Sequence, residues 1–189
     1  MNWLTFAIAA WFSLGLELGL RPALRLGPEA LAPSFVLPLA VFVCLWAPHR
    51  VALWACLACG LLVDLTWRHP ISGGGAATIL GPYALGYLLG GQLVLTLRGV
   101  LIRGNPLTMA VMSMLAAAVA HVVVVAAMTV RTLYGDPVDF APASELLVRF
   151  GASAYTGVAG LALSLLLIPL TPTFAFQQQA THRKIARRA

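Results

Sequence analysis

The stretch LTMAVMSMLAAAVAHVVVVAAMTVRTL, residues 107–133, is mostly apolar and contains a single charged residue, Arg131. A helix that crosses a bilayer needs about 20 mostly apolar residues, and this stretch exceeds that length. Five further apolar stretches, each bounded by charged residues, proline or glycine, precede or follow it. The sequence therefore predicts an all-α integral membrane protein with about six transmembrane helices. The predicted spans are 3–20, 31–47, 51–67, 76–97, 107–133 and 146–170.

Composition supports the same interpretation. Of the 189 residues, 60% are hydrophobic and only 10% are charged, whereas a soluble domain carries about 25% charged residues. We expect one transmembrane domain over 1–189, with a short basic cytoplasmic tail at about 173–189. The net charge of +6 is spread over short loops until the tail, whereas a nucleic-acid binder concentrates it on one soluble face. Nucleic acid is therefore not an expected partner, and membrane lipids are.

The distribution of Lys and Arg predicts the orientation, because cytoplasmic loops carry an excess of both. With six spans the two termini share one side. Of the 12 Lys and Arg residues, seven fall on that side and five on the other, where acidic residues dilute them. We expect a multi-pass protein of the bacterial inner membrane with both termini in the cytoplasm.

Ionisable residues within a span are costly, and three of those in the predicted spans are singled out here: Glu17, Asp64 and His121. Asp64 leaves two alternatives open: a buried contact with another helix, a partner or an ion, or an interfacial ion pair with Arg68, four residues on. Glu17 has the same spacing to Arg21, which favours a local ion pair. His121 precedes four valines, so we expect a neutral packing residue with one satisfied nitrogen, with a proton relay as the alternative.

The sequence predicts no catalytic, metal or cofactor site. Cys56-x-x-Cys59 has metal-binding spacing, but a structural zinc site needs four ligands and no second pair exists. Small thiols packed within helices are the expected state. No set of residues assembles into a catalytic constellation, so an enzyme is not expected and no cofactor is expected.

Two features suit binding to lipid or to partner helices. Small residues at a four-residue spacing let helices approach closely, and this spacing occurs at Gly15-x-x-x-Gly19 and Gly86-x-x-x-Gly90. A juxtamembrane basic cluster gains about 1 kcal/mol per Lys or Arg from anionic lipid. The tail could thus bind lipid or dock a cytoplasmic partner. Its basic residues are Arg183, Lys184, Arg187 and Arg188.

The region from about 32 to 104 resembles the rod shape-determining protein MreD family. The resemblance consists of an apolar helix, a Pro-x-Arg turn, a second helix ending in Gly-Leu-Leu-x-Asp, a glycine-rich turn and a Tyr-x-x-Gly element. The corresponding residues here are 37–46, Pro48-His49-Arg50, Gly60-Leu61-Leu62-Val63-Asp64, 73–75 and Tyr87-Leu88-Leu89-Gly90.

This resemblance implies a non-catalytic membrane subunit of the cell-elongation complex, which regulates cell shape. Its implied partners are MreC-like and MreB-like proteins, RodA and penicillin-binding-protein synthases. The family is similar in plan to the S components of energy-coupling-factor vitamin transporters, so we expect an S-component-like bundle. A substrate-binding S component is the alternative function, and it would need a central pocket with several polar groups.

Overall fold

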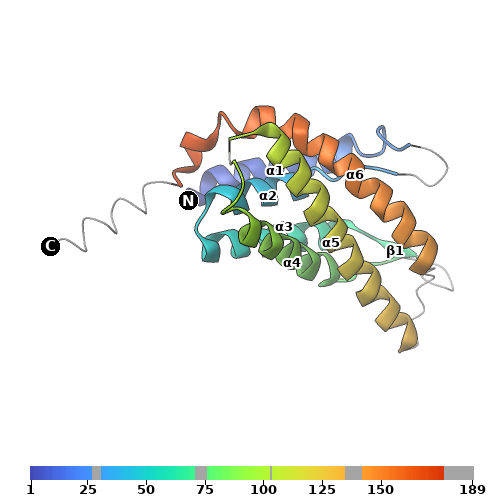
Figure 1. The fold of residues 1–189 in the computed structure, drawn as a ribbon. Coiled ribbons are helices and arrows are strands. Elements are labelled where there is room, and N and C mark those ends of the chain that lie inside the picture. The colour runs from blue at the N-terminus through green and yellow to red at the C-terminus, as the bar shows by residue number, and fades with distance from the viewer. Residues whose placement is uncertain (27–30, 71–75, 103, 135–141, 177–189) are drawn as a thin grey trace.

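The computed structural model describes residues 1–26, 31–70, 76–102, 104–134 and 142–176. These residues form six α-helices, a pair of two-residue strands and a short 3₁₀ helix (Figure 1). The described residues are therefore helical apart from one small strand pair and the loops, in agreement with the predicted helical class. The elements are α1 (Trp3–Gly19), α2 (Val36–Trp46), α3 (His49–Thr66), β1 (His69–Pro70), β2 (Ala76–Ala77), α4 (Pro82–Leu97), α5 (Pro106–Leu133), α6 (Pro142–Leu167) and η1 (Thr171–Phe174).

Helix lengths divide the bundle into two groups. Three helices, α3, α5 and α6, are long and apolar enough to cross a membrane, which indicates a membrane protein. The other three, α1, α2 and α4, have 17, 11 and 16 residues and are shorter than the predicted spans. The difference is largest at α2, whose 11 residues rise about 16 Å, roughly half the thickness of the hydrocarbon core.

Helix α2 is the centre of the bundle. It packs against all five other helices, and every residue from Val36 to Leu45 is buried. An extended segment leads into it, in which Ala32, Pro33 and Phe35 are also buried. Irregular backbone at membrane depth is tolerated where protein encloses it. The stretch predicted as a second lipid-crossing helix is thus a short core helix with an extended entry.

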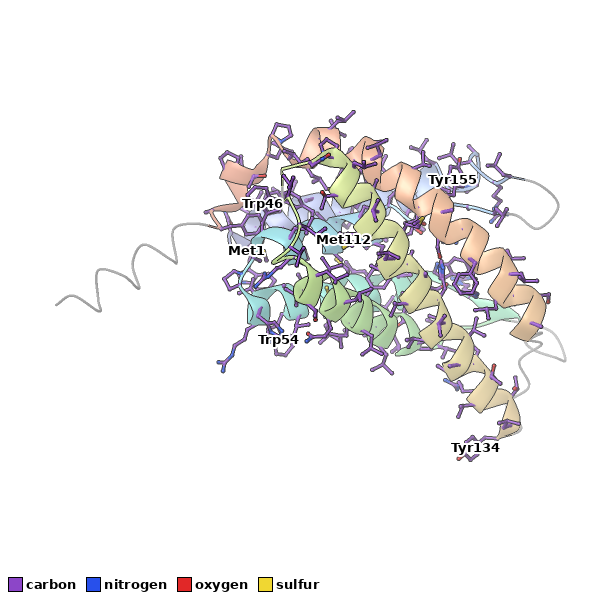
Figure 2. All side chains as sticks on the ribbon, in the orientation of Figure 1. Met1, Trp46, Trp54, Met112, Tyr134 and Tyr155 are labelled. Carbon is purple, nitrogen blue, oxygen red and sulfur yellow. The ribbon has the colours of Figure 1, made fainter. Side chains whose placement is uncertain are left out.

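Glycines set the close contacts between neighbouring helices. A Cβ atom on Gly86 or Gly90 of α4 would lie 2.9 Å or 2.8 Å from a backbone carbonyl oxygen of α5. The predicted small-residue motif of α4 is therefore an internal contact. In α1, by contrast, a Cβ on Gly15 or Gly19 would meet nothing within 4 Å. Outward faces carry large apolar side chains, such as Trp54 of α3, which is 64% exposed (Figure 2).

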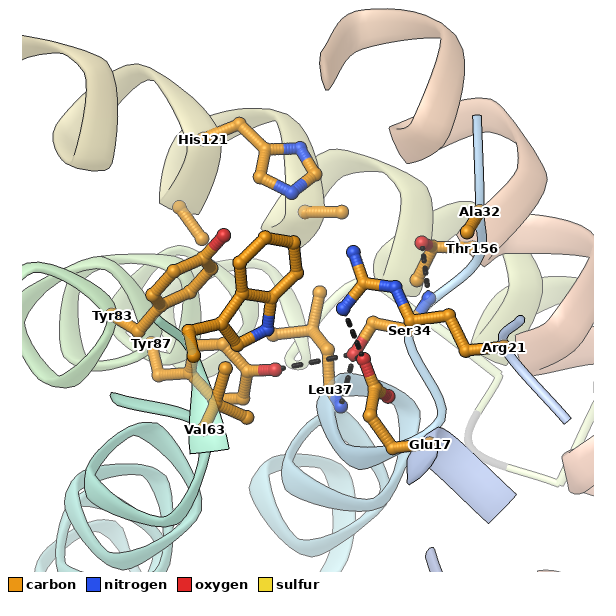
Figure 3. A pocket seen from close by; sticks show the side chains of 13 residues that line it. Glu17, Arg21, Ala32, Ser34, Leu37, Val63, Tyr83, Tyr87, His121 and Thr156 are labelled. Carbon is orange, nitrogen blue, oxygen red and sulfur yellow. Dashed lines mark hydrogen bonds and ion pairs between the residues drawn. The ribbon is translucent and has the colours of Figure 1, made fainter. Parts of the chain in front are cut away.

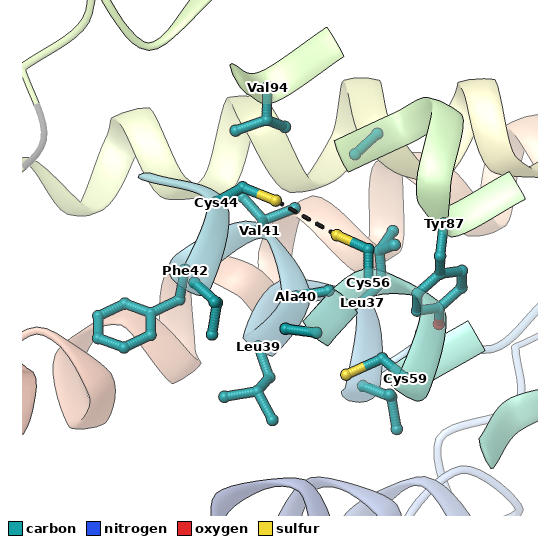
Figure 4. Packing of buried hydrophobic residues seen from close by; sticks show 14 of the residues in the cluster. Leu37, Leu39, Ala40, Val41, Phe42, Cys44, Cys56, Cys59, Tyr87 and Val94 are labelled. Carbon is teal, nitrogen blue, oxygen red and sulfur yellow. Dashed lines mark hydrogen bonds between the residues drawn. The ribbon is translucent and has the colours of Figure 1, made fainter. Parts of the chain in front are cut away.

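The apolar core joins α2 to α3 and α4 (Figure 4), and it also includes Phe174 and Phe176 at the end of the described chain. The Sγ atoms of Cys44 and Cys56 lie 3.3 Å apart as free thiols, so they pack as small side chains. Phe42 packs edge-on against Phe174, whose ring stacks on Phe176. Phe174 and Phe176 are buried, although they fall within the predicted tail 173–189. The basic residues of that tail lie outside the described residues.

Candidate functional site at the polar end of the bundle

A group of polar side chains gathers where α1 and α3 end and α2 and α4 begin, beside the middle turns of α5 and α6 (Figure 3). We call this region the polar end. It brings together Glu17, Asp64, Tyr87 and His121, which the sequence singled out, with several residues that it did not. Its polar members are Glu17, Arg21, Ser34, Asp64, Tyr83, Tyr87, His121, Arg149, Ser153 and Thr156.

Glu17 fixes the start of the core helix. Its Oε1 accepts a hydrogen bond from Arg21 Nη1 at 3.0 Å, which confirms the predicted local pair. Its Oε2 accepts from Ser34 Oγ at 3.1 Å and from the backbone N–H groups of Phe35 and Val36 at 2.5 and 3.4 Å. The first N–H groups of a helix have no partner within it. A buried carboxylate from α1 therefore satisfies the N-terminus of α2.

Asp64 does the same for α4. Its side chain is 1% exposed and accepts from the backbone N–H groups of Gly81, Tyr83 and Ala84, all at 2.9–3.0 Å. The ion pair with Arg68 was the wrong alternative, because both carboxylate oxygens bind α4 while Arg68 is exposed. The alternative of a buried helix-to-helix contact describes the observed geometry. A carboxylate also suits the positive end of the helix dipole.

The other end of α2 is held by a cation. Arg98, which follows α4, donates from Nη1 to the carbonyl oxygens of Cys44 at 3.1 Å and Ala47 at 2.6 Å. The last carbonyls of a helix are the counterpart of its free N–H groups. The core helix thus carries an acid at its N-terminus and an arginine at its C-terminus, both supplied by neighbouring segments and both matched to the dipole.

Ser34 links three helices at the polar end. Its hydroxyl lies 3.3 Å from the Tyr87 hydroxyl of α4, and its backbone N–H donates to Thr156 Oγ1 of α6 at 3.0 Å. Tyr87 is 3% exposed. The extended entry to α2 is therefore tied to α1, α4 and α6 at once, and Tyr87 of the Tyr-x-x-Gly element takes part.

A second set of contacts joins α6 to α4 and α5. Arg149 donates to the Tyr83 hydroxyl at 2.9 Å and to Glu145 at 3.0 Å. His121 Nδ1 lies 2.9 Å from Ser153 Oγ, which confirms the expectation of one satisfied ring nitrogen. The His121 ring faces the polar interior in Figure 3. These contacts fix the register of α6 against its neighbours.

Two adjoining cavities lie at the polar end. The inner one, about 20 Å³, is lined by Glu17, Tyr87 and His121 among others, and this volume suffices for about one water molecule. The outer one, about 280 Å³, lies beside the ends of α1 and α3. Arg21 and Trp67 border both cavities, and the Arg21 guanidinium carbon lies 4.1 Å from the centre of the Trp67 ring.

The sequence pattern that resembles the MreD family is called the family-like pattern below. Its remaining residues lie outside the polar end. Pro48 and Arg50 are exposed at the opposite end of α3, where Pro48 is the N-cap. Gly60 faces α4, where a Cβ would lie 2.5 Å from Ala84 Cα. Gly90 packs against α5. The pattern therefore builds helix contacts, and only Asp64 and Tyr87 belong to the polar end. The tail residues Arg183, Lys184, Arg187 and Arg188 lie outside the described residues.

Sequence reasoning missed the roles of Ser34, Tyr83 and Arg149. Arg149 was detectable, because a cation within the predicted span 146–170 needs a partner at membrane depth. The other two hydrogen-bond across helices more than 50 residues apart in sequence, and no local spacing encodes such a contact.

The described residues contain no group of three or more His, Cys, Asp or Glu side chains that could hold a metal ion. The sequence matches no protein-family model, no curated protein and no solved structure. The geometry of the polar end nevertheless has a clear structural effect. It ties the buried N-termini of α2 and α4 to carboxylates from α1 and α3.

Proposed function

We propose that this chain is a non-catalytic membrane subunit of a bacterial cell-elongation complex, of the MreD kind. In this role it scaffolds peptidoglycan synthesis together with MreC-like and MreB-like proteins, RodA and penicillin-binding-protein synthases. On this proposal all six helices lie in the inner membrane, and both termini are cytoplasmic.

The proposal rests on one observation: the residues of the family-like pattern make the contacts between neighbouring helices. Gly60 lets α3 approach α4, and Asp64 caps α4 from the next turn of α3. Tyr87 ties α4 to the entry of α2, while Gly90 lets α4 approach α5. Residues that were recognised only as a sequence pattern thus specify one arrangement of helices. A pattern that encodes architecture is what a scaffold subunit requires.

The size of the inner cavity favours the scaffold over the S-component alternative. Ligand pockets commonly measure about 300–1,000 Å³, whereas the inner cavity has about 20 Å³. The outer cavity of about 280 Å³ lies beside the ends of α1 and α3 and is not a central pocket. The polar side chains that line the inner cavity already hydrogen-bond to one another, for example Glu17 with Arg21 and Ser34 with Tyr87. A vitamin-sized solute does not fit there without separation of the helices.

Helix α1 supplies a surface suited to a partner helix. Gly15 and Gly19 lie on an exposed face together with Trp11 and Ile8, which are 79% and 63% exposed. The four-residue glycine spacing allows a second helix to approach the backbone. On α4 the same spacing is filled by α5, so the α1 motif is the one left accessible for a partner.

The test is a detergent pull-down of the tagged full-length chain from its native membranes, read by mass spectrometry. Recovery of an MreC-like protein with the synthases supports the proposal. We expect Gly15→Leu to reduce that recovery, because the added side chain blocks the close approach. Ala126→Leu, a similar enlargement at an exposed position of α5, is the control. Recovery of an ATPase module, or a vitamin that copurifies, would instead identify an S component.

A further inference from the structure

The outer cavity at the polar end is lined by three arginines. It measures about 280 Å³ and lies between the end of α1 and the end of α3. Arg21 and Arg25 come from the segment after α1, and Arg68 follows α3. Leu18 and Trp67 provide an apolar wall. Guanidinium groups that converge on one cavity from two segments form an arrangement suited to an anion.

The charge of this lining is unbalanced. Glu17 is the single acid that borders the cavity within the described residues, against three arginines, which leaves two positive charges in excess. The Glu17 carboxylate already accepts from Arg21 and from the backbone at the start of α2. Arg21 is held over Trp67 by a cation–π contact, whereas Arg25 and Arg68 are exposed at the mouth.

The position of the outer cavity indicates which class of anion could bind there. It lies where the apolar helices α1 and α3 end, and tryptophan is enriched at the level where hydrocarbon meets water. The fork of donors on arginine matches phosphate oxygens in two-point contacts. Leu18, 57% exposed, offers an apolar surface beside the charged mouth. At this level a bound phosphate group can come from a lipid headgroup or from a phosphate ion dissolved in water.

We propose that the outer cavity binds a phosphate-bearing anion between Arg25 and Arg68, with Arg21 and Trp67 as its fixed inner wall. This site is separate from the helix surface of α1 to which the proposed partners would bind. It also does not depend on the identity of those partners.

The experiment uses the purified full-length chain in a nonionic detergent. Native mass spectrometry compares the binding of phosphatidylglycerol with that of phosphatidylcholine, and phosphorus NMR follows the binding of inorganic phosphate. The test variants are Arg25→Gln and Arg68→Gln, both at exposed positions. Arg50→Gln is the matched control, because it removes an arginine that is also exposed but lies at the other end of α3.

We expect preferential binding of phosphatidylglycerol, weakened about fivefold by each test substitution, as follows from about 1 kcal/mol per basic residue. Arg50→Gln should leave this binding unchanged. If inorganic phosphate binds with the same dependence on Arg25 and Arg68 and the lipids show no preference, the site is supported and its source is a soluble anion. Equal loss in all three variants, or no binding of either anion, would overturn the proposal.

Discussion

Gly60 and Asp64 lie one turn apart on the same face of α3, and both meet the first turn of α4. A Cβ on Gly60 would lie 2.5 Å from Ala84 Cα, while Asp64 accepts a hydrogen bond from the Ala84 N–H at 3.0 Å. Gly60 permits α3 and α4 to approach closely. Without the short distance between the helices, Asp64 could not reach the backbone of α4.

Asp64→Asn should destabilise the protein by about 1–3 kcal/mol, because a buried amide replaces one acceptor oxygen with a donor that faces backbone N–H groups. The free energy of unfolding can be measured by circular dichroism during SDS titration of mixed micelles. Glu145→Gln is the control. It changes a carboxylate that is 44% exposed and accepts from a single side chain, Arg149, which keeps its hydrogen bond to the Tyr83 hydroxyl, so it should cost less than Asp64→Asn. Equal effects of the two substitutions would contradict the capping role.

Gly60→Ala should destabilise the bundle by about 1–3 kcal/mol, because the new methyl group would press on the backbone of Tyr83 and Ala84. The matched control is Gly15→Ala in α1, where a Cβ meets nothing within 4 Å. Alanine is a better helix former than glycine by about 1 kcal/mol, so this control should be neutral or slightly stabilising. The same SDS titration measures both. A Gly60→Ala variant as stable as the native chain would refute the close approach.

Glu17 and Arg21 should be energetically coupled by about 1 kcal/mol or more in a double-mutant cycle. The three variants are Glu17→Gln, Arg21→Gln and the double substitution. Coupling is expected because Glu17 is 3% exposed and Arg21 is only 23% exposed, so water screens the pair poorly. Glu17→Gln alone should cost more than Arg21→Gln, since it also removes an acceptor for the start of α2. Additive effects would show that the two residues act independently.

The three cysteines should resist maleimide in mild detergent and react after SDS denaturation. Cys44, Cys56 and Cys59 are each 0% exposed and lie in the core drawn in Figure 4. Ala23→Cys, at an exposed position after α1, is the positive control and should react at once. Gel shifts after labelling with maleimide-polyethylene glycol count the reactive thiols. Rapid labelling of the native chain would place α2 and α3 outside the core.

The proposed orientation predicts where a reporter fused to the C-terminus is active. Alkaline phosphatase folds only in the periplasm, so this fusion should be inactive, whereas green fluorescent protein should fluoresce. The same pair of fusions after Arg98, between α4 and α5, should give the same result, because it lies on the same side as the termini. A fusion after Tyr134, which follows α5, should give the opposite result. Active phosphatase at the C-terminus would reverse the topology.

The sequence predicted where the helices lie along the chain better than whether each helix faces lipid or protein. All six apolar stretches contain a helix, and the long α5 begins at Pro106, one residue before the predicted start. The fourth span was expected from 76 but α4 begins at Pro82, where proline suits the first helical turn. Apolar periodicity cannot distinguish a side chain that faces lipid from one that faces protein. The enclosed position of α2 was therefore not predictable.

Within the polar end, only contacts between near neighbours were predictable. The pair of Glu17 and Arg21 follows from a four-residue spacing. The same rule offered Arg68 as one of two alternatives for Asp64. It could not identify the observed partners, because almost every residue other than proline has a backbone N–H group, and such groups carry no sequence signature. Gly81-Pro82 marks the start of a helix 17 residues after Asp64. That helix start was the available indication of unsatisfied backbone N–H groups for a buried acid.

The enclosure of α2 has a consequence for biogenesis. Five helices surround it, and the last of them, α6, is synthesised about 100 residues later than α2. Until α6 emerges from the ribosome, one side of α2 has no permanent neighbour, and Thr156 is not yet present to bind the entry segment at Ser34. The native bundle therefore cannot close during translation of its first half. A nascent chain arrested before α6 would be a substrate for membrane quality-control proteases.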